Sequence, residues 1–173
     1  VGAVLQRARV PEGASALVIG VGGIGLNVIQ GLALAGATTI IAVDTNPLKA
    51  EIAKTFGATH FLESTEGVKD VLSGGVDFAF ECVGHVKLIR ACIDLLDWGG
   101  TAVMLGVPGF ADEASFNVSS MYLDKGVLGC RYGSSQPVRD IRRYVELYQQ
   151  GRLKLDELVS ARYPLADMDK AVP

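Results

Sequence analysis

The chain has 173 residues, 49% of them hydrophobic and 20% charged, a composition typical of a packed globular protein and not of a disordered one. A net charge of −3 without any run of lysine or arginine argues against a nucleic-acid partner, and no apolar stretch has the roughly 18 residues of a membrane span. The three cysteines and two histidines are scattered, without C-x-x-C or H-x-x-x-H, so no metal site is expected in this chain, and the odd, sparse thiols favour a cytoplasmic protein.

Six short apolar runs rich in valine, isoleucine and phenylalanine predict β-strands. They lie at residues 17–20, 39–44, 60–62, 77–81, 101–105 and 127–131. Longer segments with apolar residues at every third or fourth position separate them, and this alternation is typical of βαβ units that build a parallel sheet. The pattern predicts an α/β fold with a complete doubly wound six-stranded sheet, and the usual strand order of such a dinucleotide-binding sheet is 3-2-1-4-5-6.

Capping residues indicate where the helices begin and end. Asn46 followed by Pro47 predicts a helix start, and Gly57 predicts its end. A helix over residues 85–97 is expected to end at the glycine pair 99–100.

Two further helices are predicted toward the chain ends. The segment 137–150 is expected to form a helix that ends at Gly151, with an apolar stripe made of Val138, Ile141, Val145 and Tyr148. Residues 1–10 read as an amphipathic helix with nothing upstream to pack on, and residues 166–172 open another helix just before Pro173. These features predict that the chain is part of a longer polypeptide.

The strongest signal is the glycine-rich run Gly20-Val21-Gly22-Gly23-Ile24-Gly25, which follows the first strand and precedes a helical segment at 26–34. In this context the run predicts a dinucleotide-binding turn. Gly20 permits a tight turn, Gly22 lets a pyrophosphate approach the backbone, and Gly25 lets the helix pack close to the sheet. Unpaired N–H groups at the helix N-terminus would bind the phosphates. The alternative is a turn that merely saves space.

An acidic residue, Asp44, stands at the end of the second strand, nineteen residues after Gly25. A carboxylate at this place accepts hydrogen bonds from the adenosine ribose and repels the 2′-phosphate of NADP, so it predicts NAD as the cofactor. Helix capping is the alternative role, but Asn46 already serves there. Lys49 lies one helical turn on and either reaches the same ribose or is a solvated surface lysine.

The fourth and fifth strands end in residues 81–84 (Glu-Cys-Val-Gly) and 105–108 (Leu-Gly-Val-Pro). In an open α/β sheet, ligands bind outside the carboxyl ends of the strands where the strand order reverses, so both segments should border the dinucleotide. Val83, Leu105 and Val107 would form a dry wall there, or else they are ordinary core residues.

Together these motifs resemble the coenzyme domain of the zinc-type, medium-chain alcohol dehydrogenases, with a character similar to the class III-like or aryl-alcohol branches. The matching segments, in the same order and spacing, are residues 20–25, 43–49, 75–78, 81–84, 99–100 and 105–108. The resemblance implies a Rossmann domain that binds NAD for hydride transfer between a small-molecule alcohol or aldehyde and the cofactor.

The resemblance also implies a place for each candidate cofactor residue. Gly22 and Gly23 would contact the pyrophosphate, with Ile24 behind the nicotinamide ring. The adenosine ribose would be held by Asp44 and Lys49, with Asn46 beside it. The adenine and ribose side would be lined by Cys82, Val83 and His85. The carboxamide would be bound by the backbones of Leu105, Cys130 and Tyr132, next to Gly106 and Val107. His85 replaces an arginine often found in such enzymes.

The zinc ligands of that family are not present in this sequence. Such enzymes hold zinc in an upstream domain, so zinc is expected only in the full-length enzyme, and no catalytic residue or metal ligand is assigned to this chain. Residues 1–133 are expected to form the NAD-binding domain, with 1–11 as a linking helix, and 134–173 to return to the missing catalytic domain. A homodimer through the edge strand 127–131 is also implied.

Three alternatives stay open. A zinc-free quinone or enoyl reductase of the same superfamily would usually use NADPH, which Asp44 disfavours. A methyltransferase is not supported by the wholly apolar run before Gly20. A non-catalytic nucleotide-sensing module could carry the same glycine turn. Cys92 is expected in the core, whereas the sequence assigns no role to His60 and does not identify the alcohol.

Overall fold

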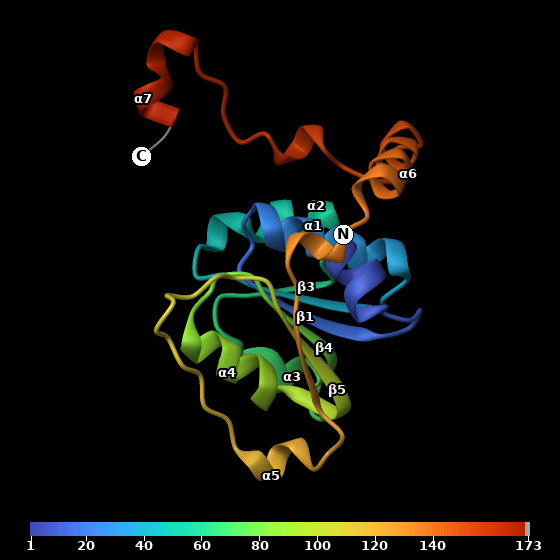
Figure 1. The fold of residues 1–173 in the computed structure, drawn as a ribbon, viewed down its shortest axis with the longest axis vertical. Helices are drawn as coiled ribbons and strands as arrows, with labels where there is room; N and C mark the ends of the chain where they lie inside the picture. Colours follow the sequence, from blue (N-terminus) through green and yellow to red (C-terminus); the bar gives the residue numbers. More distant parts are fainter. Residues whose placement is uncertain (172–173) are drawn as a thin grey trace.

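A six-stranded parallel β-sheet forms the centre of the molecule (Figure 1). In the computed structural model, which describes residues 1–171, the strands are β1 (Ser15–Ile19), β2 (Thr39–Val43), β3 (His60–Leu62), β4 (Val76–Glu81), β5 (Leu96–Met104) and β6 (Gly126–Gly129). Neighbouring strands pair in parallel in the order β3-β2-β1-β4-β5-β6. The predicted fold class and strand order are confirmed, and the order reverses between β1 and β4.

Apolar side chains on both faces of the strands explain why these segments form a buried sheet. Along β1, Ala16 and Val18 belong to one hydrophobic cluster, whereas Leu17 and Ile19 belong to another. Successive side chains of a strand point to opposite faces, so one strand contributes to both clusters. A strand that is buried on both sides appears in the sequence as a continuous apolar run, which is the pattern that predicted it.

Helices cover both faces of the sheet (Figure 1). On one face lie α1 (Gly23–Ala35), α2 (Ala50–Phe56) and the N-terminal π-helical segment η1 (Ala3–Ala8). On the other face lie α3 (Val68–Val71) and α4 (Val86–Asp94). The other elements are η2 (Pro47–Lys49), η3 (Thr65–Gly67), α5 (Val118–Met121), η4 (Tyr132–Ser134), α6 (Pro137–Gln149), η5 (Asp156–Leu158), η6 (Leu165–Asp167) and α7 (Met168–Ala171).

The capping signals around α2 act as predicted. The Asn46 side chain accepts a hydrogen bond from the Leu48 N–H at 3.0 Å and so caps η2, the 3-10 turn that leads into α2. Gly57 ends the helix with a φ of 113°, in the left-handed region that favours glycine. The helix start and stop read from this segment are confirmed.

The helix predicted over residues 85–97 is shorter in the structure, and its predicted end is wrong. α4 ends at Asp94, and Leu96 already belongs to β5, where it pairs with Val76 of β4. This pairing draws the chain into the sheet directly after the helix. The glycine pair 99–100 therefore lies inside β5, beside a register shift between β4 and β5, and does not terminate the helix.

The segment predicted as an N-terminal helix finds its partner downstream in the chain. η1 packs against α1, and Ala3 and Val4 are fully buried. A Cβ on Gly31 of α1 would lie 3.2 Å from a side-chain atom of Val4, so glycine permits the close approach of the two helices.

The C-terminal segment lies outside the α1 and α2 layer and leads away from the sheet (Figure 1). The apolar stripe predicted for α6 is present but exposed, whereas Asp140 of the same helix is buried. The Gln30 side chain fastens the stretch after α6 to α1, because it accepts a hydrogen bond from the Lys154 N–H at 2.9 Å and donates to the Lys154 carbonyl at 3.2 Å.

The helix predicted over residues 166–172 is divided between η6 and α7. Val172 and Pro173 lie outside the described residues. Over residues 1–171, no helix combines the length and the apolar character needed to cross a membrane.

Candidate functional site

The candidate cofactor residues gather along one edge of the sheet. They occupy the segments that follow β1, β2, β4, β5 and β6, and parallel strands present such segments at their common carboxyl edge. The members are Gly20, Gly22, Gly23, Ile24, Gly25, Asp44, Asn46, Lys49, Cys82, Val83, His85, Leu105, Gly106, Val107, Cys130 and Tyr132. The reversal of strand order between β1 and β4 lies in the middle of this edge.

Two glycines of the turn after β1 are required by the fold itself. Gly20 has a φ of 93°, and a Cβ there would lie 2.6 Å from Cγ2 of Val83. A Cβ on Gly25 would lie 1.8 Å from the Gly20 carbonyl oxygen, far inside contact distance. These glycines let α1 start directly above the strand.

The other two glycines of the turn have no such internal reason. A Cβ on Gly22 or Gly23 would meet no atom within 4 Å. α1 begins at Gly23, and the first N–H groups of a helix have no intrahelical acceptor. The Leu26 N–H is the first to close a turn, on the Gly22 carbonyl at 2.9 Å. An open surface beside unpaired N–H groups at a helix N-terminus is suited to a phosphate group.

Asp44 joins the end of β2 to the glycine turn. Its Oδ2 accepts hydrogen bonds from the Val21 N–H and from Lys49 Nζ, each at 2.8 Å, and its Oδ1 accepts from the Asn46 N–H at 3.0 Å. Partial burial acts to raise the pKa of this carboxyl, but the hydrogen bond from Lys49 and those from the two N–H groups outweigh it, so the pKa lies below its usual range. Asp44 is therefore held in its charged form beside the open turn.

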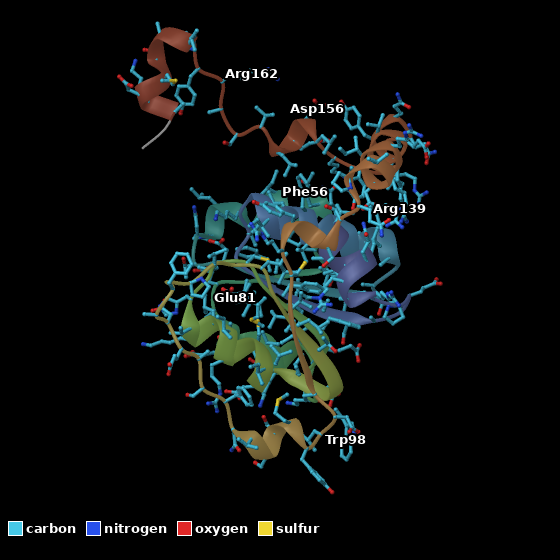
Figure 2. The ribbon with its side chains drawn as sticks, in the orientation of Figure 1. Phe56, Glu81, Trp98, Arg139, Asp156 and Arg162 are labelled. Carbon is cyan, nitrogen blue, oxygen red and sulfur yellow. The ribbon has the colours of Figure 1, made fainter. Side chains whose placement is uncertain are left out.

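Glu81, the last residue of β4, is a part of this edge whose role the sequence did not reveal. Its side chain is fully buried, and its Oε1 accepts hydrogen bonds from the N–H groups of Val83 at 3.0 Å and Gly84 at 2.9 Å. The signal was a carboxylate that follows the apolar residues 78–80 of the strand and comes directly before a glycine-containing turn. Figure 2 labels Glu81 at this edge and Trp98 at the opposite one.

The apolar residues after β4, β5 and β6 fall into two groups, one exposed and one half-buried. Val83 and Val107 are exposed, at 53% and 85%, as a wall facing a ligand would be. Leu105, Cys82 and Cys130 pack instead against the hydrophobic cluster of β1 and α1. The structure thus places the two valines on the surface and the other three against the core.

Backbone groups near the ends of β5 and β6 form a set suited to an amide. The Leu105 N–H donates to the Glu81 carbonyl at 2.9 Å, and the Cys130 N–H donates to the Met104 carbonyl at 3.0 Å. Within the described chain, the carbonyls of Leu105 and Cys130 accept no hydrogen bond, and the Tyr132 N–H donates none. Two acceptors and one donor match the two N–H groups and one oxygen of a carboxamide.

The histidines take structural positions. His85 is exposed at the start of α4, and its Nδ1 accepts a hydrogen bond from the Lys87 N–H at 3.2 Å, which makes it a helix cap. His60 at the start of β3 is also exposed, and its ring nitrogen lies 2.9 Å from the Thr59 hydroxyl. The two rings thus lie on different elements, one at the start of β3 and the other at the start of α4.

All three cysteines are free thiols. Cys92 is fully buried in the cluster of α4 and β4, as predicted. Burial, with the Glu81 carboxylate as a second cause, raises the pKa of the Cys82 and Cys92 thiols. Neutral thiols are poor nucleophiles and poor metal ligands. In the part of the chain that the structure describes, no three His, Cys, Asp or Glu side chains come together as a metal site.

Two surface hollows of about 660 and 270 Å³ lie beside α6 and not at the carboxyl edge of the sheet. The first is lined by Gln136 and Arg139 among others, and the second by Arg143 and Arg152 among others. Neither includes a candidate cofactor residue.

Similarities to known proteins extend over almost the whole chain. A family model described as zinc-binding dehydrogenase matches residues 23–150. Alcohol dehydrogenase class-3 from Cereibacter sphaeroides is 34% identical across 98% of this chain and 49% of its own length. The chain therefore spans about half the length of the curated relatives it matches.

Solved structures share the same fold. Benzyl alcohol dehydrogenase from Acinetobacter calcoaceticus superposes with a TM-score of 0.92 at 32% identity, covering 98% of this chain and 48% of that one. A protein described as a zinc-binding dehydrogenase from Sinorhizobium meliloti, with bound NADP, gives a TM-score of 0.78 at 28% identity over 87% of this chain and 45% of that one.

Proposed function

The chain belongs to the zinc-binding dehydrogenase family, and from this premise we propose that it is the coenzyme-binding part of an NAD-dependent alcohol dehydrogenase. The observation that carries the proposal is the open glycine turn at the N-terminus of α1, with the charged Asp44 beside it. The bound nicotinamide would take a hydride from an alcohol or return one to an aldehyde. The residues of this chain would supply position and cofactor selectivity, not acid, base or metal ligands.

The phosphates would lie against Gly22 and Gly23. The absence of any atom within 4 Å of their Cβ positions supports this placement, because the missing side chains leave room that no part of the described chain fills. Ile24, which is 50% exposed, would pack behind the nicotinamide ring. The α1 N-terminus would add roughly 0.3–1 kcal/mol of stabilisation per phosphate charge.

Asp44 and Lys49 would select NAD over NADP. A carboxylate offers about four acceptor positions; three of those on Asp44 are occupied. One position remains for a ribose hydroxyl, and Lys49 Nζ could donate to the other hydroxyl. A 2′-phosphate would face the Asp44 charge directly, so NADP should bind more weakly. The relative with bound NADP makes this preference worth direct measurement.

The rest of the dinucleotide would follow the strand ends. Val83 and His85 would border the adenine and its ribose, with Cys82 behind them. The carboxamide would bind the carbonyls of Leu105 and Cys130 and the N–H of Tyr132, since these backbone groups have no other partner in residues 1–171. Gly106 and Val107 would complete the wall on the nicotinamide side.

Zinc would be held by a part of the enzyme that this chain does not supply. The two histidines are separate and exposed, and the buried cysteines are protonated thiols, so the chain's own donors do not fit a zinc ion. Residues 1–133 would be the NAD-binding domain and 134–173 the return to a catalytic domain. The exposed apolar stripe of α6 supports this division, because it leaves a face for that domain.

Two further proposals concern assembly and location. β6 has one neighbour in the sheet, β5, and its free edge would pair with the same strand of a second copy to form a homodimer. A cytoplasmic location is supported by three cysteines that are all free.

Calorimetric titration of the purified chain with NADH, NADPH and S-adenosylmethionine tests the proposed function. We expect NADH to bind, NADPH to bind at least about tenfold more weakly, and S-adenosylmethionine not to bind. Tighter binding of NADPH would favour a quinone or enoyl reductase, and binding of S-adenosylmethionine alone would favour a methyltransferase. Dehydrogenase turnover by the zinc-free chain would contradict the assignment of the chemistry to a separate domain.

The runner-up from a different class is a non-catalytic nucleotide-sensing module. It would give the same titration, so the discriminating measurement is the sequence of the longer polypeptide. Zinc-ligand motifs upstream of Val1 would support the dehydrogenase, and an upstream region without them would support the sensing module.

A further inference from the structure

We infer that Glu81 is a positioning residue of the coenzyme site, whose buried carboxylate holds the turns after β4 and β5 in the shape that receives the dinucleotide. The inference rests on the proposed function, because the turns matter for binding only if a dinucleotide lies against them. Glu81 itself would touch no ligand, since its side chain is fully buried.

The carboxylate organises the turn after β4 through backbone donors. Oε1 accepts from the N–H groups of Val83 at 3.0 Å, Gly84 at 2.9 Å and, more weakly, His85 at 3.5 Å. Oε2 accepts from the Gly84 N–H at 3.0 Å. Three successive N–H groups thus converge on one side chain, and the turn cannot rotate away without leaving a buried carboxylate unsatisfied.

No cation compensates this charge. Among residues 1–171, no lysine, arginine or histidine forms an ion pair with Glu81. An isolated buried carboxylate is costly unless hydrogen bonds replace its hydration. The backbone dipoles of the turn are therefore what allows Glu81 to be buried, and Glu81 in return fixes their direction.

The main chain of Glu81 organises the neighbouring turn after β5. Its carbonyl accepts from the N–H groups of Leu105 at 2.9 Å and Gly106 at 3.0 Å. A Cβ on Gly106 would lie 2.6 Å from Oε2 of Glu81 and 1.9 Å from the Gly84 nitrogen, so only glycine allows the two turns to pack so closely. One residue therefore connects the turn assigned to the adenosine side with the turn assigned to the carboxamide side.

The turn after β4 in turn contacts the glycine turn after β1. Val83 approaches Gly20 so closely that a Cβ on Gly20 would lie 2.6 Å from Cγ2 of Val83. Val83 is half exposed, so few neighbours pack around its side chain. Its backbone N–H donates to Glu81, and this hydrogen bond fixes where the residue lies. The carboxylate thus sets the spacing between the phosphate turn and the apolar wall.

The test compares Glu81→Gln with Asp77→Asn, the same carboxylate-to-amide change at an exposed position of the same strand. Asp77 also accepts a backbone N–H, from Ser15 at 2.7 Å, but it lies at the start of β4, away from every candidate cofactor residue. Glu81→Gln keeps the side-chain shape but replaces one carboxylate oxygen by an amide NH2 group, which brings a donor against the Gly84 N–H. Circular dichroism first establishes the temperature range in which each variant is folded.

In that range we expect Glu81→Gln to raise the Kd for NADH at least about tenfold, the effect of a turn that keeps its binding shape for about one-tenth of the time. Asp77→Asn should leave the Kd within about twofold, a difference well under 1.4 kcal/mol. An unchanged Kd in Glu81→Gln, or an equal rise in Asp77→Asn, would overturn the inference. Absence of NADH binding by the wild-type chain would instead contradict the proposed function.

A second measurement decides the matter if Glu81→Gln does not fold. Hydrogen exchange of the wild-type chain without ligand should show the N–H groups of Val83 and Gly84 exchanging at least about 100-fold more slowly than that of Phe110, which has no acceptor among the described residues. Equal rates would mean that the carboxylate does not hold the turn before the ligand arrives, and the inference would fail.

Discussion

Carboxylates accept hydrogen bonds from backbone N–H groups at both edges of the parallel sheet, but these bonds serve different purposes. At the amino edge, Asp77 accepts hydrogen bonds from the N–H and the hydroxyl of Ser15, both at 2.7 Å, and its own N–H donates to that hydroxyl at 3.0 Å. This edge ties β1 to β4 and serves stability.

At the carboxyl edge, carboxylates also accept backbone N–H groups, but the turns they hold have open outer surfaces. Asp44 and Glu81 fix the turns after β1, β2 and β4, while Gly22 faces empty space and Val83 is half exposed. A carboxylate that is hydrogen-bonded to the backbone thus serves stability at the amino edge and surface shape at the carboxyl edge.

Gly25→Ala should damage the fold most. Its Cβ would lie 1.8 Å from the Gly20 carbonyl oxygen, a backbone atom that cannot rotate away, so we expect a loss of at least about 3 kcal/mol in the free energy of unfolding. Urea denaturation followed by circular dichroism measures it. A loss below about 1 kcal/mol would show that the contact between α1 and the glycine turn can relax.

Asp44→Ala should change cofactor preference more than stability. Removing the charge ends its repulsion of the 2′-phosphate and frees Lys49 Nζ, which lies 2.8 Å from Oδ2, to bind that phosphate. The ratio of the Kd values for NADPH and NADH should fall by at least about tenfold. If the ratio kept its wild-type value in calorimetric titrations, Asp44 would not be the selecting residue.

Gly22→Ala is the counterpart of Gly25→Ala within the same turn. Its backbone, with φ −96° and ψ −167°, suits any residue, and no atom lies within 4 Å of the new Cβ, so the free energy of unfolding should change by less than about 0.5 kcal/mol. The added methyl group would occupy the place proposed for the pyrophosphate and raise the Kd for NADH about tenfold. Unimpaired binding would move the phosphates elsewhere.

Ser15→Ala tests the amino edge alone. It removes two hydrogen bonds with Asp77 and should lower the free energy of unfolding by about 1 kcal/mol. The Kd for NADH should stay at the wild-type value, because the change lies at the far end of β1. A weakened NADH affinity would show that the two edges are coupled.

The pH dependence of Asp44 should give the smallest effect. Its pKa is lowered in the folded chain, so its contribution to stability is fully present above the unfolded pKa of about 3.9 and is lost as the pH falls through the lower folded value. The difference in urea midpoint between wild type and Asp44→Asn should therefore shrink below about pH 4. A difference that stays constant down to pH 2 would contradict the ion pair with Lys49.

Much of the fold could be predicted because its signals are local. Apolar runs such as residues 39–44 are strands buried on both faces, and the run from Gly20 to Gly25 between strand and helix indicated both the turn and its purpose. The glycine pair 99–100 was misread, because glycine is typical of helix ends and only the pairing of Leu96 with Val76 shows that the strand has already begun.

Local patterns in the sequence are enough to predict the alternation of strands and helices, the phosphate turn and the acidic residue beside it, since each of them depends on about 25 neighbouring residues. Only the tertiary structure decided which glycines serve the fold and which face open space, and that the stripe of α6 is exposed. It also decided the role of Glu81, whose carbonyl meets Leu105 and Gly106 across two strands. Contacts between residues distant in sequence have no local pattern, so they become visible only when the chain is folded.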